Sequence, residues 1–255
     1  MIRILTFCTL IFSILIGKDI TAYEVMERVY SLKKPKTSIM EIKLELVRKK
    51  GKREKKKVRE FIRYEKYYDS GPYRSKSVSR FTEPKMINGT GLLSWVERDG
   101  NTQQWFFLPK LKKPKKISTK EKSKSFLNTD FIYEDLESRS LGMDSLVSIG
   151  TEFLDNLQCH VIIAWPNNTS NYFFRKIWIN NQNWQICKVE YYTNETTKEK
   201  TLFLSKFIEK DGFTTPGKFI MEVVNGNKTI MEIISFQPDI GLKEEIFSKS
   251  FLVKN

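Results

Sequence analysis

Strict alternation of apolar and charged residues over positions 40–46 limits the fold of this chain more than any other feature. The segment reads Met-Glu-Ile-Lys-Leu-Glu-Leu, which predicts a β-strand with one buried and one solvated face. Turn residues such as Asp99-Gly100 separate the strand-like segments. The pattern predicts a mainly β chain with a few helices (α+β), built on a large, curved antiparallel sheet of about 11 strands. The other ten predicted strands are 57–67, 73–82, 91–97, 102–108, 157–165, 172–180, 184–192, 201–208, 217–224 and 229–236.

Helical spacing is confined to three short stretches. Residues 21–32 place apolar side chains at helical intervals, with Thr21 as the N-cap. A shorter helix is expected after Asp130, which we interpret as its N-cap, and it continues through residues 131–136. A last turn near 243–248 is expected to bring two apolar side chains onto the sheet.

The first 22 residues have the pattern of a targeting segment. A short basic start is followed by a 13-residue apolar run, Ile4–Ile16. A membrane span needs about 20 apolar residues, so the run is typical of a secretory signal peptide. We predict a signal peptide over 1–22, cleaved after Ala22, and a single exported domain over 23–255. Because Ile20 departs from the small residue preferred at that position, an uncleaved anchor remains the alternative.

The excess of positive charge is regional. The chain carries 44 Lys and Arg against 30 Asp and Glu, a formal net charge of +14. Nearly all of it lies in two runs, residues 48–59 and 110–124. The first is interpreted as a solvated hairpin tip or as a surface that docks on an anionic membrane or on an acidic partner. The second, which contains Pro114, suits a mobile lid edge, and neither run has the interleaved aromatic residues of single-strand nucleic-acid binding.

Two cysteines lie beyond the signal peptide, Cys159 and Cys187. If their strands form a meander, the two residues lie two strands apart, about 9.5 Å. A disulfide needs Cα atoms within about 7 Å. We therefore predict free, half-buried thiols.

No catalytic constellation is visible in the sequence. The single histidine, His160, follows Cys159, but strand neighbours point to opposite faces and do not form a dyad. The acidic residues Asp130, Glu134 and Asp135 fit the start of a helix better than acid–base chemistry. We predict a protein that is not an enzyme and that uses no cofactor and no metal.

An ordered set of motifs resembles a known family. Phe81-Thr-Glu-Pro84 is followed by segments 89–93, 104–113 and 122–126, and then by the sequence TDFIYEDL at 129–136. Together they resemble the outer-membrane lipoprotein-sorting family of LolA-like periplasmic proteins, in its larger, less characterised branch. The resemblance covers residues 23–253, with Asn128 where the family more often has glycine. It implies a half-barrel whose concave face is covered by helices around an apolar cavity.

The same resemblance implies a function. Relatives carry lipoproteins or lipids across the periplasm, or sense them, and this branch is often associated with efflux-pump-type exporters. We predict a periplasmic carrier of lipoprotein acyl chains or lipids. A lipoprotein or envelope-stress sensor that regulates a membrane partner is the alternative. An inner-membrane exporter or the membrane surface would contact the basic runs. The candidate lining residues, each of which has plain core packing as its alternative, are Met40, Ile42, Leu44, Trp95, Trp105, Phe107, Phe126 and Phe131.

Overall fold

The computed structural model describes residues 20–254, so the signal-peptide prediction falls largely outside the described residues. Most of the described chain forms one open antiparallel sheet in the order β6-β5-β4-β3-β2-β1-β15-β14-β11-β10-β9-β8-β7. A separate hairpin consists of β12 (Ile208–Lys210) and β13 (Phe213–Thr215). The strands of the large sheet are β1 (Thr37–Lys50), β2 (Arg53–Tyr67), β3 (Tyr73–Glu83), β4 (Gly91–Glu97), β5 (Thr102–Phe107), β6 (Lys115–Lys116), β7 (Asp144–Leu154), β8 (Leu157–Pro166), β9 (Phe174–Asn180), β10 (Ile186–Tyr192), β11 (Lys198–Ser205), β14 (Lys218–Val223) and β15 (Lys228–Pro238).

The mainly β prediction is confirmed, but the predicted number of about 11 strands is wrong. All eleven predicted segments are strands of the sheet, which has 13 strands in total. The two missed strands are its edges, β6 and β7. β7 was missed because most of it is exposed, including Phe153 at 73%, so one face is not consistently buried and the apolar alternation is lost.

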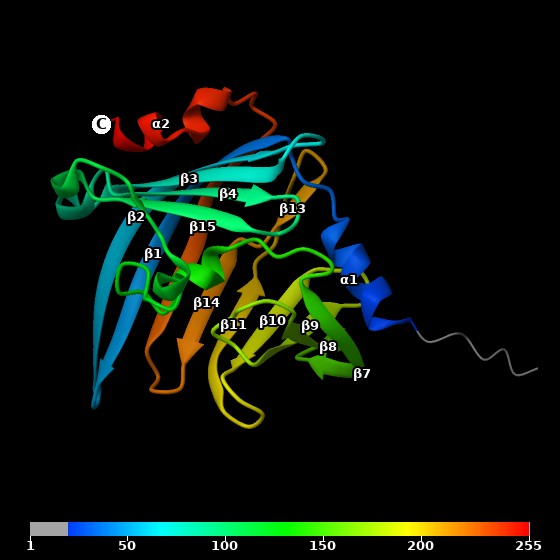
Figure 1. Ribbon diagram of the computed structural model, residues 1–255. Coiled ribbons are helices and arrows are strands. Elements are labelled where there is room, and N and C mark those ends of the chain that lie inside the picture. The colour runs from blue at the N-terminus through cyan, green and yellow to red at the C-terminus, as the bar shows by residue number, and fades with distance from the viewer. Residues whose placement is uncertain (1–19, 255) are drawn as a thin grey trace, which may run out of the picture.

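The two faces of the sheet are covered differently (Figure 1). Helix α1 (Ala22–Tyr30) packs on the inner face, where Val25 and Met26 join the apolar side chains of β8, β9 and β10. At the other end of the sheet, the turn η5 (Glu244–Phe247) and helix α2 (Lys249–Val253) pack on the outer face of β3, β4 and β5. No described helix has the length and apolar character needed to cross a membrane.

The rest of the inner face is covered mainly by irregular chain. We call residues 117–137 the cover segment; it holds only two 3-10 turns, η3 (Thr119–Glu121) and η4 (Tyr133–Leu136). The remaining 3-10 turns are η1 (Lys85–Ile87) and η2 (Pro109–Leu111). The expectation that helices cover the concave face is therefore correct for α1 alone. The cover segment takes the place of helices on the rest of the inner face, and α2 lies on the outer face.

Two of the predicted helical elements are confirmed and one is corrected. Thr21 caps α1 as expected, and its hydroxyl accepts a hydrogen bond from the Glu24 N–H at 3.2 Å. The turn near 243–248 is present, and Phe247 is buried. Asp130, however, is not an N-cap, because its carboxylate contacts two other residues and the 3-10 turn begins only at Tyr133.

The cysteines are free, as predicted. They are fully buried rather than half-buried, since Cys159 packs against Val161 and Trp178 on the outer face of β8 and β9.

Candidate functional site

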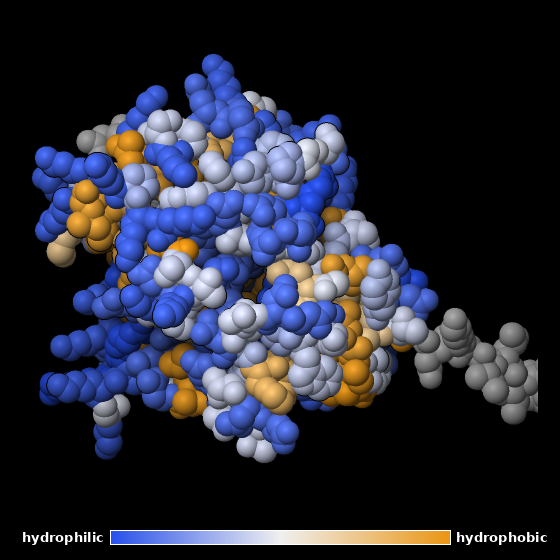
Figure 2. Space-filling view, in the orientation of Figure 1, coloured by the Kyte–Doolittle hydropathy of each residue, from blue (hydrophilic) through white to orange (hydrophobic). Residues whose placement is uncertain are grey.

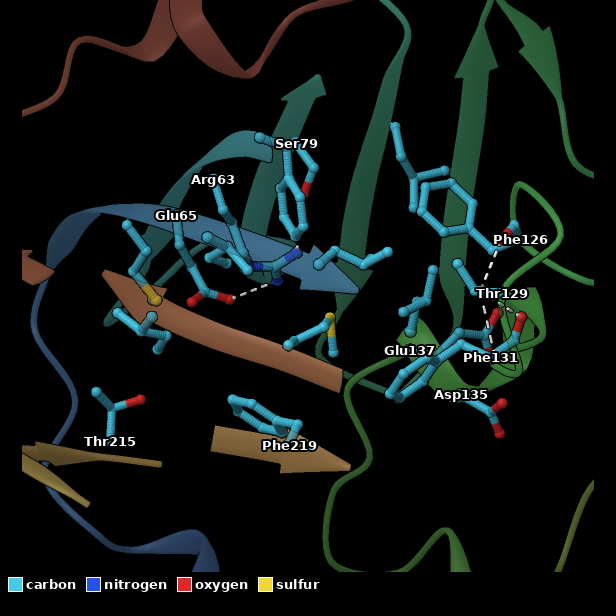
Figure 3. A pocket seen from close by; sticks show the side chains of 18 residues that line it. Arg63, Glu65, Ser79, Phe126, Thr129, Phe131, Asp135, Glu137, Thr215 and Phe219 are labelled. Atoms are coloured by element: carbon cyan, nitrogen blue, oxygen red, sulfur yellow. Dashed lines mark hydrogen bonds and ion pairs between the residues drawn. The ribbon is translucent and has the colours of Figure 1, made fainter. Parts of the chain in front are cut away.

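A cavity of about 280 Å³ lies between the inner face of the sheet and the cover segment (Figure 3). Strands β1, β2, β3, β4, β14 and β15 supply its floor, and β13 and the cover segment close its sides. Its size is just below the range of about 300–1,000 Å³ that is usual for small-molecule sites. The lining residues are Met40, Ile42, Leu44, Phe61, Arg63, Glu65, Ser79, Leu92, Phe126, Thr129, Phe131, Asp135, Leu136, Glu137, Thr215, Phe219, Met231 and Ile233.

Five of the eight residues predicted from the sequence line this cavity. Met40, Ile42 and Leu44 alternate along β1 and so share its inner face, while Phe126 and Phe131 come from the cover segment. The agreement on β1 follows from its period-two pattern, which places these three side chains on one side of the strand.

The other three residues, Trp95, Trp105 and Phe107, do not line the cavity. They lie on the outer face of β4 and β5, in an apolar cluster with Phe247. The Trp95 indole N–H donates to the Phe247 carbonyl at 2.9 Å. Alternation shows which residues share a face of a strand, but it does not show which face is concave, and this is why the prediction was wrong.

A polar group at one end of the cavity was missed by the sequence analysis. The Arg63 Nη2 atom lies 3.1 Å from Glu65 Oε1, and Arg63 Nη1 donates to Ser79 Oγ at 3.4 Å. Arg63 and Glu65 are two residues apart on β2, so their side chains point to the same face. This spacing of two residues could have indicated the pair in the sequence, but charged residues on strands were interpreted only as solvent-facing. Figure 3 shows this polar group well separated from Phe126 and Phe131, which lie at the other end of the cavity beside Asp135 and Glu137. We call the end with Arg63 the polar end and the end with the two phenylalanines the aromatic end.

Asp130 holds the cover segment to the sheet. Its carboxylate lies 2.7 Å from Arg48 Nη1 and accepts a hydrogen bond from the Thr229 hydroxyl at 2.6 Å. The Asp130 N–H in turn donates to Thr229 Oγ1 at 3.0 Å. A few residues earlier, Arg59 donates to the Leu127 carbonyl at 2.6 Å. Two arginines of the first basic run therefore fix the loop that follows the second basic run.

Asp135 forms a second attachment, and it is fully buried. Lys200 Nζ lies 2.5 Å from its carboxylate, and the Tyr172 hydroxyl donates to it at 2.6 Å. The Ile132 N–H donates to the same carboxylate at 2.7 Å. Burial raises the pKa of Asp135, while the Lys200 ammonium and these hydrogen bonds act in the opposite direction. The motif at 129–136 thus positions Phe131 over the sheet through carboxylates that have structural partners.

The other residues considered for catalysis in the sequence are either apart or structurally paired. His160 stacks on Trp184 on the inner face, with ring centroids 5.6 Å apart, whereas Cys159 belongs to the outer-face cluster. Glu134 accepts a hydrogen bond from the Asn171 N–H at 2.8 Å. Within the described part of the chain, no three His, Cys, Asp or Glu side chains gather as a metal site would require.

Comparison with known proteins identifies the fold. Residues 73–254 match the model of a protein family described as uncharacterized-protein-like. No curated protein matches the chain. A solved structure from Vibrio parahaemolyticus, titled as an outer membrane lipoprotein-sorting protein domain, is similar with a TM-score of 0.84 and 23% identity, covering 91% of this chain and 98% of that one.

Two further solved structures agree with this result. A DUF1329 family protein from Desulfovibrio piger has a TM-score of 0.83 at 23% identity, covering 91% of this chain and 97% of its own. A LolA superfamily protein from Nitrosomonas europaea has a TM-score of 0.68 at 19% identity, covering 91% and 100%. The resemblance to LolA-like proteins predicted from the motifs is therefore confirmed, and at these identities it describes the fold.

Proposed function

The chain belongs to the protein family whose model matches residues 73–254 and has the LolA-like fold, and from this premise we propose that it carries lipoprotein acyl chains or lipids. The observation that carries the proposal is the cavity itself. Apolar side chains such as Leu44 and Phe131 line most of it, and the cover segment covers one side of it. The proposed role is binding without catalysis.

The size of the hydrophobic penalty explains why such a carrier is needed. Each methylene of an acyl chain that leaves a membrane for water costs about 0.8 kcal/mol. A chain of roughly fourteen methylenes therefore costs about 11 kcal/mol in water. A cavity that replaces water with apolar side chains removes much of this cost and needs no further chemistry.

The apolar run near the N-terminus supports a location in the periplasm, where the carrier would travel between membranes. We propose that it acts there in outer-membrane lipoprotein sorting or envelope lipid transport, together with an efflux-pump-type exporter. The exported chain would contain all of residues 23–255 and, with them, the cavity that binds cargo. Detection of the protein in a periplasmic fraction tests this location.

The basic runs are proposed as the surface that meets the membrane. The first run is not a long loop: its residues lie on β1 and β2 around the turn at Gly51, with Lys50 opposite Arg53. Apart from Arg48 and Arg59, which hold the cover segment, the basic side chains of this run project into solvent at the tip of the hairpin, as Figure 2 shows for that edge of the molecule. A basic residue near an anionic membrane contributes about 1 kcal/mol. Binding to vesicles that contain an anionic lipid, and its loss at high salt, would support this surface.

The experiment that tests the proposed function measures cargo directly. The protein is purified from a periplasmic fraction, and bound lipid is extracted and identified by mass spectrometry. The delipidated protein is then titrated with a fluorescent fatty acid and with an acylated peptide. We expect co-purified lipid and saturable binding of one molecule per chain. An empty cavity with no binding of either probe would contradict the proposal.

A further inference from the structure

A second cavity adjoins the first at its polar end. It also has a volume of about 280 Å³ and shares Met40, Glu65 and Thr215 with the first cavity. Its other walls come from the end of α1, from the chain leading into β1 and from the residues around β13. The two cavities therefore lie side by side, with Met40, Glu65 and Thr215 between them.

The second cavity carries two positive charges that form no ion pair with any described residue. Lys33 and Lys34 both line it, and in residues 20–254 neither ammonium lies within 4.0 Å of a carboxylate. The Lys33 Nζ atom lies 4.5 Å from the ring centroid of Phe213, and the Lys34 Nζ atom lies 5.2 Å from that of Tyr67. Much of the Lys34 side chain is exposed, but desolvation still lowers its pKa. The charge of Glu65 acts in the opposite direction on the pKa of Lys34, but the Glu65 carboxylate is itself paired with Arg63 at 3.1 Å.

Ser38 is a second, independent sign of a missing ligand. Its side chain lines the same cavity and is only 1% exposed. Its Oγ atom has no hydrogen-bond partner among the described residues. Buried hydroxyl groups are normally hydrogen-bonded, and the free energy of folding suffers when they are not. A hydroxyl on the wall of a cavity therefore points to a polar group that occupies it.

We propose that the cargo is a single-chain amphiphile with an anionic head group, either a carboxylate or a phosphate. The inference deepens the proposed function and rests on it. The acyl chain lies in the first cavity toward Phe126, and the head group lies in the second, where Lys33 and Lys34 neutralise it. The Ser38 hydroxyl donates a hydrogen bond to it.

The volume of the first cavity favours a ligand with a single acyl chain. A cavity of about 150 Å³ lined by apolar side chains already holds benzene. The first cavity, at about 280 Å³, has room for a segment of one acyl chain but not for several chains side by side. The polar groups Arg63 and Glu65 lie where the chain would end and the head group would begin, as Figure 3 shows for the first cavity.

The test compares ligands that differ only in the head group. Dodecanoate, dodecyl phosphate and neutral dodecanol are each used to displace a neutral naphthylamine probe from the purified protein. Both anionic ligands are expected to bind roughly tenfold or more tightly than dodecanol, because charge-assisted hydrogen bonds are the stronger ones. A preference for phosphate indicates a phospholipid-derived cargo and a preference for carboxylate a free fatty acid, and either result supports the proposal.

Variants assign the selectivity to this cavity. The double variant Lys33→Gln/Lys34→Gln is expected to bind the neutral probe normally and to lose the preference for anions. Lys36→Gln is the matched control, because Lys36 does not line the cavity and its exposed side chain faces Asp69 at 3.5 Å. Equal affinity for dodecanol and the anions, or unchanged selectivity in the double variant, would overturn this inference alone. Failure of all ligands and of the probe to bind would overturn the proposed function as well.

Discussion

Lys200 Nζ lies 2.5 Å from Asp135 Oδ2, and both side chains are only 1% exposed. The two residues come from β11 and from the cover segment, so this pair fastens the cover to the sheet beside the cavity. A charge removed from water in this way is tolerated only when its partner stays in place.

The first prediction concerns this pair. Lys200→Met leaves the Asp135 carboxylate buried without its counter-charge, and we expect a loss of about 3–5 kcal/mol in the free energy of unfolding. Urea denaturation measures it. Lys198→Met on the same strand is the control, because the Lys198 side chain is 43% exposed and Glu190 keeps Lys188 as a second partner at 2.8 Å. Ion pairs with an exposed partner contribute about 1 kcal/mol or less. A Lys200→Met variant as stable as the control would contradict the role of the pair.

The second prediction concerns the N-terminus of the exported protein. The Thr21 N–H donates to the Glu24 carboxylate at 2.8 Å, the Thr21 hydroxyl caps α1, and Ile20 packs against the core. Cleavage after Ala22 would remove this cap, which contributes about 1 kcal/mol. In place of the cleavage after Ala22 predicted from the sequence, we therefore expect the mature chain to begin at or before Ile20, as N-terminal sequencing would show. A mature chain that begins at Tyr23 would mean that α1 forms without its cap.

The third prediction concerns the thiols. Burial raises the pKa of Cys159 to about 11, so at neutral pH this residue is a protonated thiol, and Cys187 is also buried. We expect a thiol reagent such as DTNB to leave both residues unmodified in the native protein and to label both in denaturant. Rapid labelling of the native protein, or a mass lower by two hydrogens, would contradict the free and inert state.

The fourth prediction concerns pH. Hydrogen bonds from Lys115 and from Ser118 lower the pKa of Glu121 from 4.5 to about 2. A depressed pKa means that the charged carboxylate stabilises the folded state. The contribution of Glu121 to the free energy of unfolding is therefore complete above pH 4.5 and is lost as the pH falls toward 2. In an NMR titration, Lys115→Gln should raise the pKa of Glu121 toward 4.5. Lys110→Gln, which removes a base that does not bind Glu121, should leave it unchanged; equal titration of Glu121 in both variants would contradict this account.

Most of the fold could be predicted from the sequence, because buried strands carry a local signal. The alternation on β1 and the turn residues between strands identified eleven strands of the sheet. β7 escaped because it is largely exposed, and α2 escaped because five residues are too few to show a helical period. The accuracy of the predicted number of strands therefore depended on how consistently each strand buries one face.

The site was less predictable, because it depends on contacts between distant parts of the chain. The outer-face position of Trp105 follows from the packing of α2, which no local pattern of β5 contains. Asp130 was expected to cap a helix, but its partners Arg48 and Thr229 lie 82 and 99 residues away in the sequence. Polar residues of the cavity such as Arg63 were missed because a charged residue on a strand usually faces solvent.

The most direct test of the central claim uses two neighbouring residues of β15. Ile233 lines the cavity, whereas Ile234 points to the opposite face and is 63% exposed. Ile233→Trp fills the cavity at a cost of about 1–3 kcal/mol in stability, and Ile234→Trp adds the same side chain outside it. Fluorescent fatty acid binding is measured for both variants at equal folded fraction. The account predicts that Ile233→Trp loses binding and that Ile234→Trp binds like the unmodified protein; normal binding by Ile233→Trp would contradict it.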